Sequence, residues 1–341
     1  MRVLVTGGCG FIGTNLVLDR LRRGDFVRVL DNCSRAGTER NLEALRAHES
    51  DGHLEILLGD VRDEEVVRYA TADVDVVFHL AAQVAVTTSV MNPREDYDIN
   101  ATGSLNVLEA ARAAVSPPIV IYTSTNKVYG GLEHAPTRER GGRYEFVSHP
   151  EGVPEDVPLD FHSPYGCSKG AADQYVIDYS RIYGLRTVTF RQSCIYGPWQ
   201  YGNEDQGWIA HFALNALRGE AVTVYGDGKQ VRDVLFVDDL IDLYDRALNR
   251  IAVAAGKAYN IGGGPGFSIS VLQCLEMLEQ AVGRQIRVTH GDWRPGDQRV
   301  YISDVRRAGE LGWCPTTSFS RGLNGLLAWM RQNIAATAVA P

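Results

Sequence analysis

Short runs of β-branched and apolar residues alternate with longer segments of helical periodicity along the first half of the chain. The apolar runs cover residues 2–6, 26–31, 54–58, 75–80, 119–124 and 185–191, and helical patterns separate them, for example at 101–114 and 166–183. Strands that alternate with helices predict βαβ units around a parallel sheet. Because such crossovers are right-handed, the pattern predicts an α/β fold with a doubly wound parallel sheet.

The alternation weakens after residue 191. Residues 195–208 and the glycine-rich stretch 262–266 have loop composition, and helical patterns return at 206–219, 268–281 and 320–334. We therefore predict two domains. Residues 1–190 form the first, to which 233–261 return, and residues 191–232 and 262–335 form a smaller, loop-rich C-terminal lobe that holds the substrate.

A long polar stretch, rich in proline and charge, lies between Gly130 and Tyr165. Loops of that length are uncommon in compact domains unless they carry a function or move. Two interpretations stay open: residues 131–164 fold over a substrate, or they decorate the surface.

Composition excludes some classes of protein. The 341 residues are 45% hydrophobic and 22% charged, which is ordinary for a globular protein. A formal net charge of −8 disfavours nucleic acid as a partner, because phosphate backbones repel an acidic surface. The chain has no apolar run long enough for a membrane span and no signal peptide before its first strand, so we expect neither membrane insertion nor secretion.

The six cysteines stand singly along the chain, with no C-x-x-C pair and no histidine cluster beside them. This spacing favours neither a disulfide framework nor a zinc site, and we expect no metal. It suits a reducing cytoplasm, which we predict as the location.

A glycine-rich turn follows the first predicted strand and opens the first predicted helix. In its sequence TGGCGFIG, Gly7 permits a tight turn, Gly10 a close approach of backbone to a pyrophosphate, and Gly13 close helix–strand packing. The helix start offers free N–H groups and a partial positive charge to phosphates. Asp31, at the end of the second strand, can accept hydrogen bonds from an adenosine ribose. These features together predict a Rossmann-type dinucleotide-binding domain.

The acid at that position favours NAD over NADP, because a 2′-phosphate would meet the negative charge of Asp31. Arg35 is the counter-argument, since an arginine can bind that phosphate. Further cofactor contacts are expected at the carboxyl ends of the next strands, where ligands approach such sheets. They are Asp60 and Val61 after the third strand, and Leu80, Ala81, Ala82 and Gln83 after the fourth. We interpret His79 as a packed strand residue and not as a catalyst.

Tyr165 and Lys169 begin a helical pattern and are four residues apart, which places them on one face of one helix. Removing the proton of a phenol with its ordinary pKa near 10 costs about 4 kcal/mol at pH 7. A lysine ammonium and a positive nicotinamide ring can supply most of that free energy in a partly dry cleft. Thr125, at the end of the hydroxyl-rich run 123–125, completes a candidate catalytic set. Such a set can take a proton from a hydroxyl while hydride leaves the same carbon.

The chain resembles the extended short-chain dehydrogenase/reductases that act on nucleotide sugars, the epimerase/dehydratase family, over nearly its whole length. The resemblance is carried by TGGCGFIG, YGCSK, GDGKQVRDVLFVDD and RPGDQRVYISD. Within the family it is strongest to the branch that inverts C2 of CDP-linked 3,6-dideoxyhexoses. The segments HLAAQVAVTTSVMNP, TSTNKVYG, LDFHSPYGCSKGAADQY and DQGW carry that narrower likeness.

This resemblance implies an NAD-dependent C2 epimerase of a CDP-hexose, with NAD regenerated in every cycle. The related 4,6-dehydratases carry an Asp-Glu pair after the threonine, where this chain has Asn126 and Lys127, so loss of water is disfavoured. Thr125 would orient the sugar hydroxyl, Tyr165 would act as base and then as acid, and Lys169 would hold the phenolate.

The resemblance also implies the remaining contacts of the two ligands. For the cofactor they are Phe11, Ile12, Asn32, Ser34, Arg35, Asn100 and Thr123, together with Tyr165 and Lys169. For the nucleotide sugar they are Gln83, Thr125, Asn126, Lys127, His162, Cys194, Trp208, Arg232, Arg294 and Arg299. Cys194 stands where many relatives carry asparagine, and its role stays open. Trp208 serves equally well as a core anchor of the small lobe.

Two alternatives fit the same motifs. An epimerase that acts at another carbon, or on a UDP- or GDP-sugar, is the nearest one. A module that senses NAD without turnover is an alternative of another class, which the intact Thr125, Tyr165 and Lys169 set disfavours because a sensor needs no base. The resemblance further implies a homo-oligomer, a dimer or a tetramer, assembled through helices of the larger domain.

Overall fold

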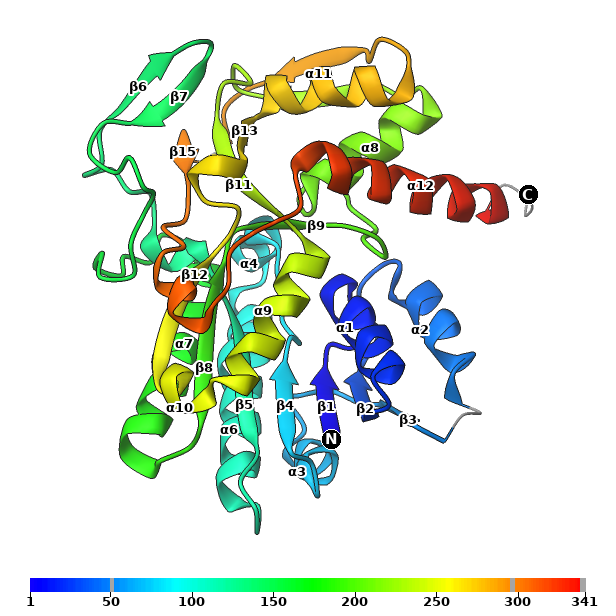
Figure 1. Ribbon diagram of the computed structural model, residues 1–341, viewed down its shortest axis with the longest axis vertical. Coiled ribbons are helices and arrows are strands. Elements are labelled where there is room, and N and C mark those ends of the chain that lie inside the picture. Colours follow the sequence, from blue (N-terminus) through cyan, green and yellow to red (C-terminus); the bar gives the residue numbers. More distant parts are fainter. Residues whose placement is uncertain (50–51, 295–297, 338–341) are drawn as a thin grey trace.

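The computed structural model describes residues 1–49, 52–294 and 298–337. Its centre is a seven-stranded sheet with the order β12-β8-β5-β4-β1-β2-β3, in which every neighbouring pair is parallel (Figure 1). The strands are β1 (Arg2–Thr6), β2 (Phe26–Asp31), β3 (Leu54–Leu58), β4 (Val76–His79), β5 (Ile119–Thr125), β8 (Thr187–Gln192) and β12 (Lys257–Ile261). The predicted doubly wound α/β fold is therefore confirmed.

Helices cover both faces of this sheet because successive strand residues point to opposite sides. Val3 and Val5 of β1 pack with α1 (Phe11–Arg22), α2 (Thr38–Arg46) and α9 (Val237–Asn249). Leu4 between them packs with α3 (Glu64–Thr71), α6 (Gly103–Ala113) and α7 (Pro164–Tyr183). The strands are buried on both faces, which explains their nearly continuous apolar sequences.

A second group of elements lies beyond the carboxyl ends of the large sheet, at the top of Figure 1. A four-stranded sheet joins β9 (Cys194–Tyr196), β11 (Val231–Phe236), β13 (Ser268–Ser270) and β15 (Val300–Tyr301), and β10 (Val222–Tyr225) pairs with β14 (Val288–Gly291). α8 (Trp208–Arg218), α11 (Val271–Val282) and α12 (Phe319–Thr337) pack around a separate core there. Between these elements the chain returns once to the large sheet: α9 contacts α1, and β12 forms the edge of that sheet.

The polar stretch before α7 contains regular structure. β6 (Thr137–Arg140) and β7 (Arg143–Phe146) form an antiparallel hairpin whose turn has Gly141 and Gly142 at φ 59° and 76°. Positive φ at both turn residues suits the tight hairpins that match strand twist. Tyr144 and Phe146 pack in one apolar cluster with Val231 of β11. The hairpin is therefore attached to the small sheet.

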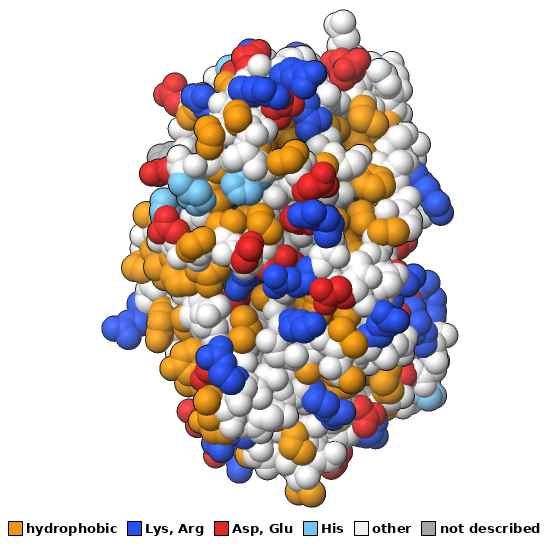
Figure 2. All heavy atoms as spheres, turned by 60° about the vertical axis from the view of Figure 1, so that its left-hand side comes forward, with side chains coloured by type: hydrophobic (Ala, Val, Ile, Leu, Met, Phe, Trp, Pro, Cys, Tyr) orange, Lys and Arg blue, Asp and Glu red, His pale blue; other side chains and the backbone are white. Residues whose placement is uncertain are grey.

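The remaining elements are short. They are α4 (Val86–Met91), α5 (Pro93–Tyr97), the π-helical turn η2 (Asp98–Thr102), η3 (Asn126–Tyr129), α10 (Ile251–Ala254), η4 (Pro265–Phe267) and η5 (Arg307–Leu311). Among the described residues, no helix is both long and apolar enough to cross a membrane. On the face shown in Figure 2, basic and acidic side chains lie intermixed with apolar ones.

Candidate active site

The glycine loop between β1 and α1 is packed too tightly for side chains. Gly7 has a φ of 70°, and a Cβ atom there would lie 2.7 Å from the backbone nitrogen of Ala81. At Gly13 a Cβ atom would lie 2.6 Å from Cα of Gly8 and would also clash with the carbonyl oxygen of Gly7. Gly10 caps α1 without a side-chain hydrogen bond, so the first N–H groups of the helix face the loop. This backbone cradle fits a pyrophosphate.

Asp31 braces the same loop from the end of β2. Its Oδ2 accepts from the Cys9 N–H at 2.9 Å, and its Oδ1 accepts from the Cys33 N–H at 2.8 Å. Burial raises the pKa of this carboxyl, and the backbone hydrogen bonds oppose that rise. A ribose hydroxyl that donates to Asp31 would stabilise the charged form.

The next cofactor candidates lie side by side at the ends of β2 and β3. Asn32 donates to Asp60 Oδ2 at 2.8 Å and accepts from the Ser34 N–H at 3.1 Å. Arg62 binds Asp60 through two hydrogen bonds of 2.9 and 2.7 Å and lowers the pKa of that carboxyl to about 2. Val61, by contrast, is buried in the core under α6. Its side chain therefore packs in the core, and its carbonyl oxygen accepts from Asn106 Nδ2 at 3.0 Å.

β4 ends beneath the glycine loop. The Ala81 N–H donates to Thr6 Oγ1 at 3.3 Å, which holds the backbone of residues 80–82 close to Gly7. His79 joins Thr6 Oγ1 at 2.7 Å to Ser104 Oγ at 2.9 Å through its two ring nitrogens. Burial lowers the pKa of His79 to about 3, so its ring is neutral and structural.

The backbone of Gln83 and the side chain of Asn100 are joined by two hydrogen bonds. The Gln83 N–H donates to Asn100 Oδ1 at 2.9 Å, and Asn100 Nδ2 donates to the Gln83 carbonyl at 3.0 Å. The Gln83 side chain turns inward, where its Nε2 donates to Asp96 Oδ1 at 2.8 Å and to the Ala85 carbonyl at 2.9 Å. Its amide hydrogens are therefore used within the protein, which makes Gln83 part of the site's support.

The three catalytic candidates come together at the end of β5. The hydroxyl of Thr125, the last residue of that strand, lies close enough to the phenol of Tyr165 to oppose the rise of its pKa. Tyr165 and Lys169 lie on the first turns of α7, whose start is fixed by Ser163 accepting from the Gly166 N–H at 3.0 Å. Lys169 Nζ donates to the Thr123 carbonyl at 2.5 Å and lies 4.3 Å above the Tyr122 ring.

Burial shifts the pKa of both titratable side chains of this set, Tyr165 and Lys169. Tyr165 is 8% and Lys169 3% exposed. Burial raises the pKa of Tyr165 to about 12, while the Thr125 hydrogen bond and the guanidinium of Arg35 oppose that rise. Burial lowers the pKa of Lys169 to about 7 against the charges of Asp173 and Asp96.

Five of the substrate candidates lie at or beside the place where β9 runs next to β11. Burial raises the pKa of the Cys194 thiol, and the charges of Arg232 and Lys127 and a hydrogen bond with Trp208 oppose that rise. Arg232 lies on β11, two residues before the Val234 that pairs with Cys194. Asn126 and Lys127 begin η3 directly after Thr125. The structure thus joins the small lobe to the catalytic set at this point.

The other three substrate candidates have contacts elsewhere. His162 hydrogen-bonds Asp160 Oδ2 at 2.9 Å and lies beside Gly130 and Gly131. Arg299 is exposed and stacks 5.1 Å above the Tyr144 ring of the hairpin. Arg294 pairs with Asp205 at 3.4 Å. The middle of the predicted segment RPGDQR, residues 295–297, lies outside the described residues.

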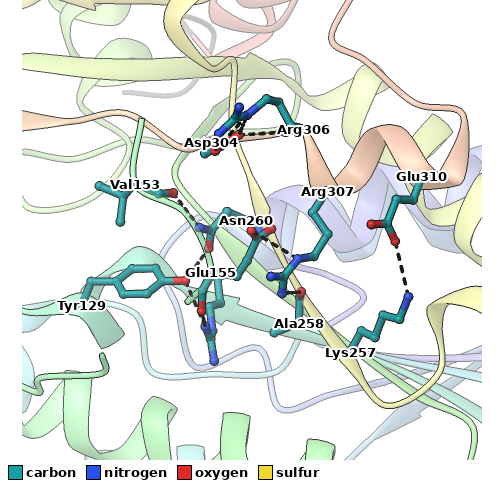
Figure 3. A network of polar contacts seen from close by, with 11 residues as sticks. Tyr129, Val153, Glu155, Lys257, Ala258, Asn260, Asp304, Arg306, Arg307 and Glu310 are labelled. Carbon is teal, nitrogen blue, oxygen red and sulfur yellow. Dashed lines mark hydrogen bonds and ion pairs between the residues drawn. The ribbon is translucent and has the colours of Figure 1, made fainter. Parts of the chain in front are cut away.

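Sequence reasoning missed a buried network behind the catalytic set. Asp173 forms a two-point ion pair with Arg191, with N–O distances of 2.8 and 3.0 Å, and accepts from Ser124 Oγ at 2.6 Å. From there the network runs through Tyr129 and Asn260 toward the edge strand β12 (Figure 3). The sequence contained a signal for this network, because Asp173 lies one turn beyond Lys169 and Arg191 is a charged residue within an apolar strand.

The glycine cradle, the acid at the end of β2 and the Tyr–Lys pair on α7 together define a short-chain dehydrogenase/reductase of the extended type. The family model described as GDP-mannose 4,6 dehydratase matches residues 4–326, and the chain belongs to this epimerase/dehydratase family. The expected family is thus confirmed, and with it the expectation of an enzyme.

Curated relatives share the family. The chain is 44% identical over 337 residues to a CDP-paratose 2-epimerase of Salmonella typhi, covering 96% of this chain and 99% of the relative. It is 32% identical to a UDP-glucose 4-epimerase of Mycolicibacterium smegmatis, covering 97% and 99% of the two chains.

A solved structure gives the same result at the level of the fold. The chain is 31% identical to a dTDP-glucose 4,6-dehydratase of Streptomyces venezuelae solved with NAD, with a TM-score of 0.84 and 98% of each chain covered.

Proposed function

We propose that this protein inverts C2 of a CDP-activated hexose of the paratose/tyvelose type through a transient 2-keto sugar. One observation carries the proposal. The set Thr125, Tyr165 and Lys169 is complete, and the two residues that directly follow Thr125 are Asn126 and Lys127. This arrangement supports oxidation at a hydroxyl-bearing carbon, whereas it has no carboxylate pair for loss of water at that position. The likeness to a CDP-paratose 2-epimerase supports the same choice of carbon and nucleotide.

The cofactor that we propose is NAD, with which the similar dehydratase was solved. The backbone of Gly7, Gly10 and Gly13 would hold its pyrophosphate, and Asp31 its adenosine ribose. When bound, NAD supplies a hydride acceptor that returns the same hydride at the end of the cycle.

The protein's own residues would transfer the proton of the C2 hydroxyl. Thr125 orients the C2 hydroxyl, and Tyr165 accepts its proton and later returns it. Because burial raises the pKa of Tyr165 to about 12, the phenolate needs nearby positive charge, which the Lys169 ammonium supplies one turn along α7. The planar sugar ketone must then present its other face before hydride returns, which inverts the configuration at C2.

The nucleotide would extend from this point into the small lobe. Arg232 and Lys127, which both act on the Cys194 thiol, bring positive charge to the junction of the lobes. Arginine and lysine side chains are the usual partners of a diphosphate. We therefore propose that the CDP diphosphate binds near Arg232, with Trp208 beside it.

A second candidate is an epimerase for another carbon or another nucleotide sugar. The 32% identity to a UDP-glucose 4-epimerase over nearly the whole chain favours it. The two candidates share the catalytic set and differ in how the sugar is presented to it.

The deciding experiment uses the purified protein without added NAD. It is incubated separately with CDP-paratose, CDP-glucose and UDP-glucose, and the C2 and C4 epimers are resolved by NMR. Conversion of a CDP sugar at C2, with deuterium at C2 retained in the product, is the expected result. Conversion of UDP-glucose at C4 would replace the proposal by the second candidate.

Replacing Tyr165 by Phe should abolish turnover while NAD stays bound, because the hydroxyl is the proton carrier and the ring only fills space. Turnover falls by at least about 100-fold if general acid–base catalysis is lost. The comparison is made by epimer NMR and by the NAD released on denaturation. Unchanged turnover would remove Tyr165 from the mechanism and revive the NAD-sensing alternative.

We further propose a cytoplasmic homo-oligomer. The described cysteines are all free, as in a reducing compartment. α7 exposes Tyr175, Ile182 and Tyr183 on the large domain, and exposed apolar clusters of this kind are typical of subunit contacts.

A further inference from the structure

Asp96 is a buried carboxylate beneath the catalytic helix. It lies on α5, a five-residue helix that contacts α7, and is 1% exposed. Its Oδ2 accepts from Ser168 Oγ at 2.5 Å, and its Oδ1 accepts from Gln83 Nε2 at 2.8 Å and Asn100 Nδ2 at 3.1 Å. These donors are all neutral, so they satisfy the oxygens without cancelling the charge. Burial raises the pKa of the Asp96 carboxyl, and the hydrogen bonds from Ser168 and Gln83 and the charge of Lys169 oppose that rise.

Asp173, the other buried carboxylate near Lys169, is in a different situation. It lies one turn after Lys169 on α7, but the guanidinium of Arg191 binds both of its oxygens. Both carboxylates raise the pKa of Lys169, Asp173 more than Asp96. Asp96 differs from Asp173 in that its hydrogen-bond donors are neutral side chains and not a guanidinium.

We propose that Asp96 is a positioning residue of the Tyr165–Lys169 pair: its buried negative charge keeps Lys169 as an ammonium, and its bond to Ser168 fixes the turn between them. This role of Asp96 rests on one part of the proposed function, namely that Tyr165 and Lys169 transfer the proton. It is independent of which sugar is the substrate.

The charges around Lys169 determine in which direction its pKa moves when the charge of Asp96 is removed. Besides Asp96 and Asp173, its polar surroundings are the Thr123 carbonyl, the Tyr122 ring and His79, which is neutral. Burial lowers the pKa of Lys169 to about 7, and both carboxylates raise it. Removing the charge of Asp96 must therefore move the pKa of Lys169 further down, so that less ammonium is present at neutral pH.

Tyr165 responds in the same direction. Burial raises its pKa, Asp96 raises it further, and Thr125 and Arg35 oppose the rise. Loss of the Asp96 charge should therefore lower the pKa of the phenol as well. Both limbs of a pH–activity profile then move to lower pH, a change that a merely structural role would not produce.

The test replaces Asp96 by Asn, which has the same shape. One amide oxygen can still accept from Gln83 and Asn100, and the Ser168 hydroxyl can accept from the new NH₂ group while donating to the Tyr165 carbonyl, 3.2 Å away. Because the sequence contains only Lys127, Lys169, Lys229 and Lys257, ε-¹³C-lysine NMR gives a few signals to follow against pH. The Lys169 signal is assigned by its loss in Lys169→Arg.

We expect the titration midpoint of Lys169 to fall by about one pH unit in Asp96→Asn, the scale of the effect of a nearby charge. Asp96→Glu, which keeps the charge, should retain a midpoint near that of the natural protein. Glu95→Gln is the matched control, because it removes an exposed carboxylate from the same helix and should leave the midpoint unchanged.

An unchanged Lys169 midpoint in Asp96→Asn would overturn the proposal. If that variant does not fold, γ-¹³C-aspartate NMR of the natural protein decides, with the Asp96 signal assigned by its loss in Asp96→Glu. A carboxyl that stays protonated at pH 7 carries no charge and also overturns it. Neither measurement uses a sugar, so a failure of the proposed epimerisation is seen separately, in the epimer assay.

Discussion

Gly13 shows how strongly a single residue can be constrained by backbone alone. A Cβ atom there would meet backbone atoms of Gly7 and Gly8, which cannot rotate away as a side chain would. We expect Gly13→Ala to lower the free energy of unfolding by about 1–3 kcal/mol, as overpacking does, and to lose most bound NAD. Thermal unfolding and the NAD content of the purified protein measure the two effects.

The control for this change is Gly309→Ala, since a Cβ atom at Gly309 meets nothing within 4 Å and its φ is not positive. It should leave both the melting temperature and the bound NAD unchanged. A Gly13→Ala protein that keeps both would show that the loop opens more easily than its packing indicates.

A buried ion pair joins α7 to β8. Arg191 on β8 binds Asp173 on α7, so the helix that carries Tyr165 and Lys169 is attached to the sheet at its middle, and Arg191 also donates to Tyr129 at 2.9 Å. Arg191→Met leaves Asp173 as an unpaired buried charge. We expect it to lower the free energy of unfolding in urea by about 3–5 kcal/mol.

Arg186→Met serves as the comparison at this element, because Arg186 lies just before β8 and is exposed. It should change the unfolding free energy by no more than about 0.5 kcal/mol. If Asp173→Asn restores much of the stability lost in Arg191→Met, the unpaired charge is the cause. If it does not, the loss comes from packing around Tyr129.

At the level of the whole molecule, we predict that a second copy covers the exposed end of α7. Ile182 is 61% exposed there and has Tyr175 and Tyr183 on the same helix, both about half exposed. Ile182→Asp should convert the oligomer into monomers, because it places a charge in an apolar contact. Light scattering after size-exclusion chromatography gives the mass directly.

Val288→Asp is the control, since Val288 is an exposed apolar residue on β14, in the small lobe. It should leave the mass unchanged. A natural protein that is already monomeric at micromolar concentration would remove the oligomer from the proposal, without affecting the proposed reaction.

The local patterns of the sequence were enough for most of the large sheet. The predicted strand at 75–80 is Val76–His79, and the strand at 185–191 is displaced by only one or two residues, to Thr187–Gln192. Apolar periodicity and glycine positions depend on neighbours in the chain, so they can be interpreted without a structure. For the same reason the four-residue spacing of Tyr165 and Lys169 was sufficient to put them on one helix face.

The surroundings of that pair depend on contacts between segments far apart in the chain. Asp96 precedes Ser168 by 72 residues, and Arg191 meets Asp173 because α7 packs against β8. Gln83 turns inward to Asp96, and Arg299 packs on a hairpin whose existence the polar stretch before α7 did not indicate. Local sequence thus specified the elements and the reactive groups. The order of strands and the packing of loops specified which charges face those groups, since burial and Coulomb interactions act through space and not along the chain.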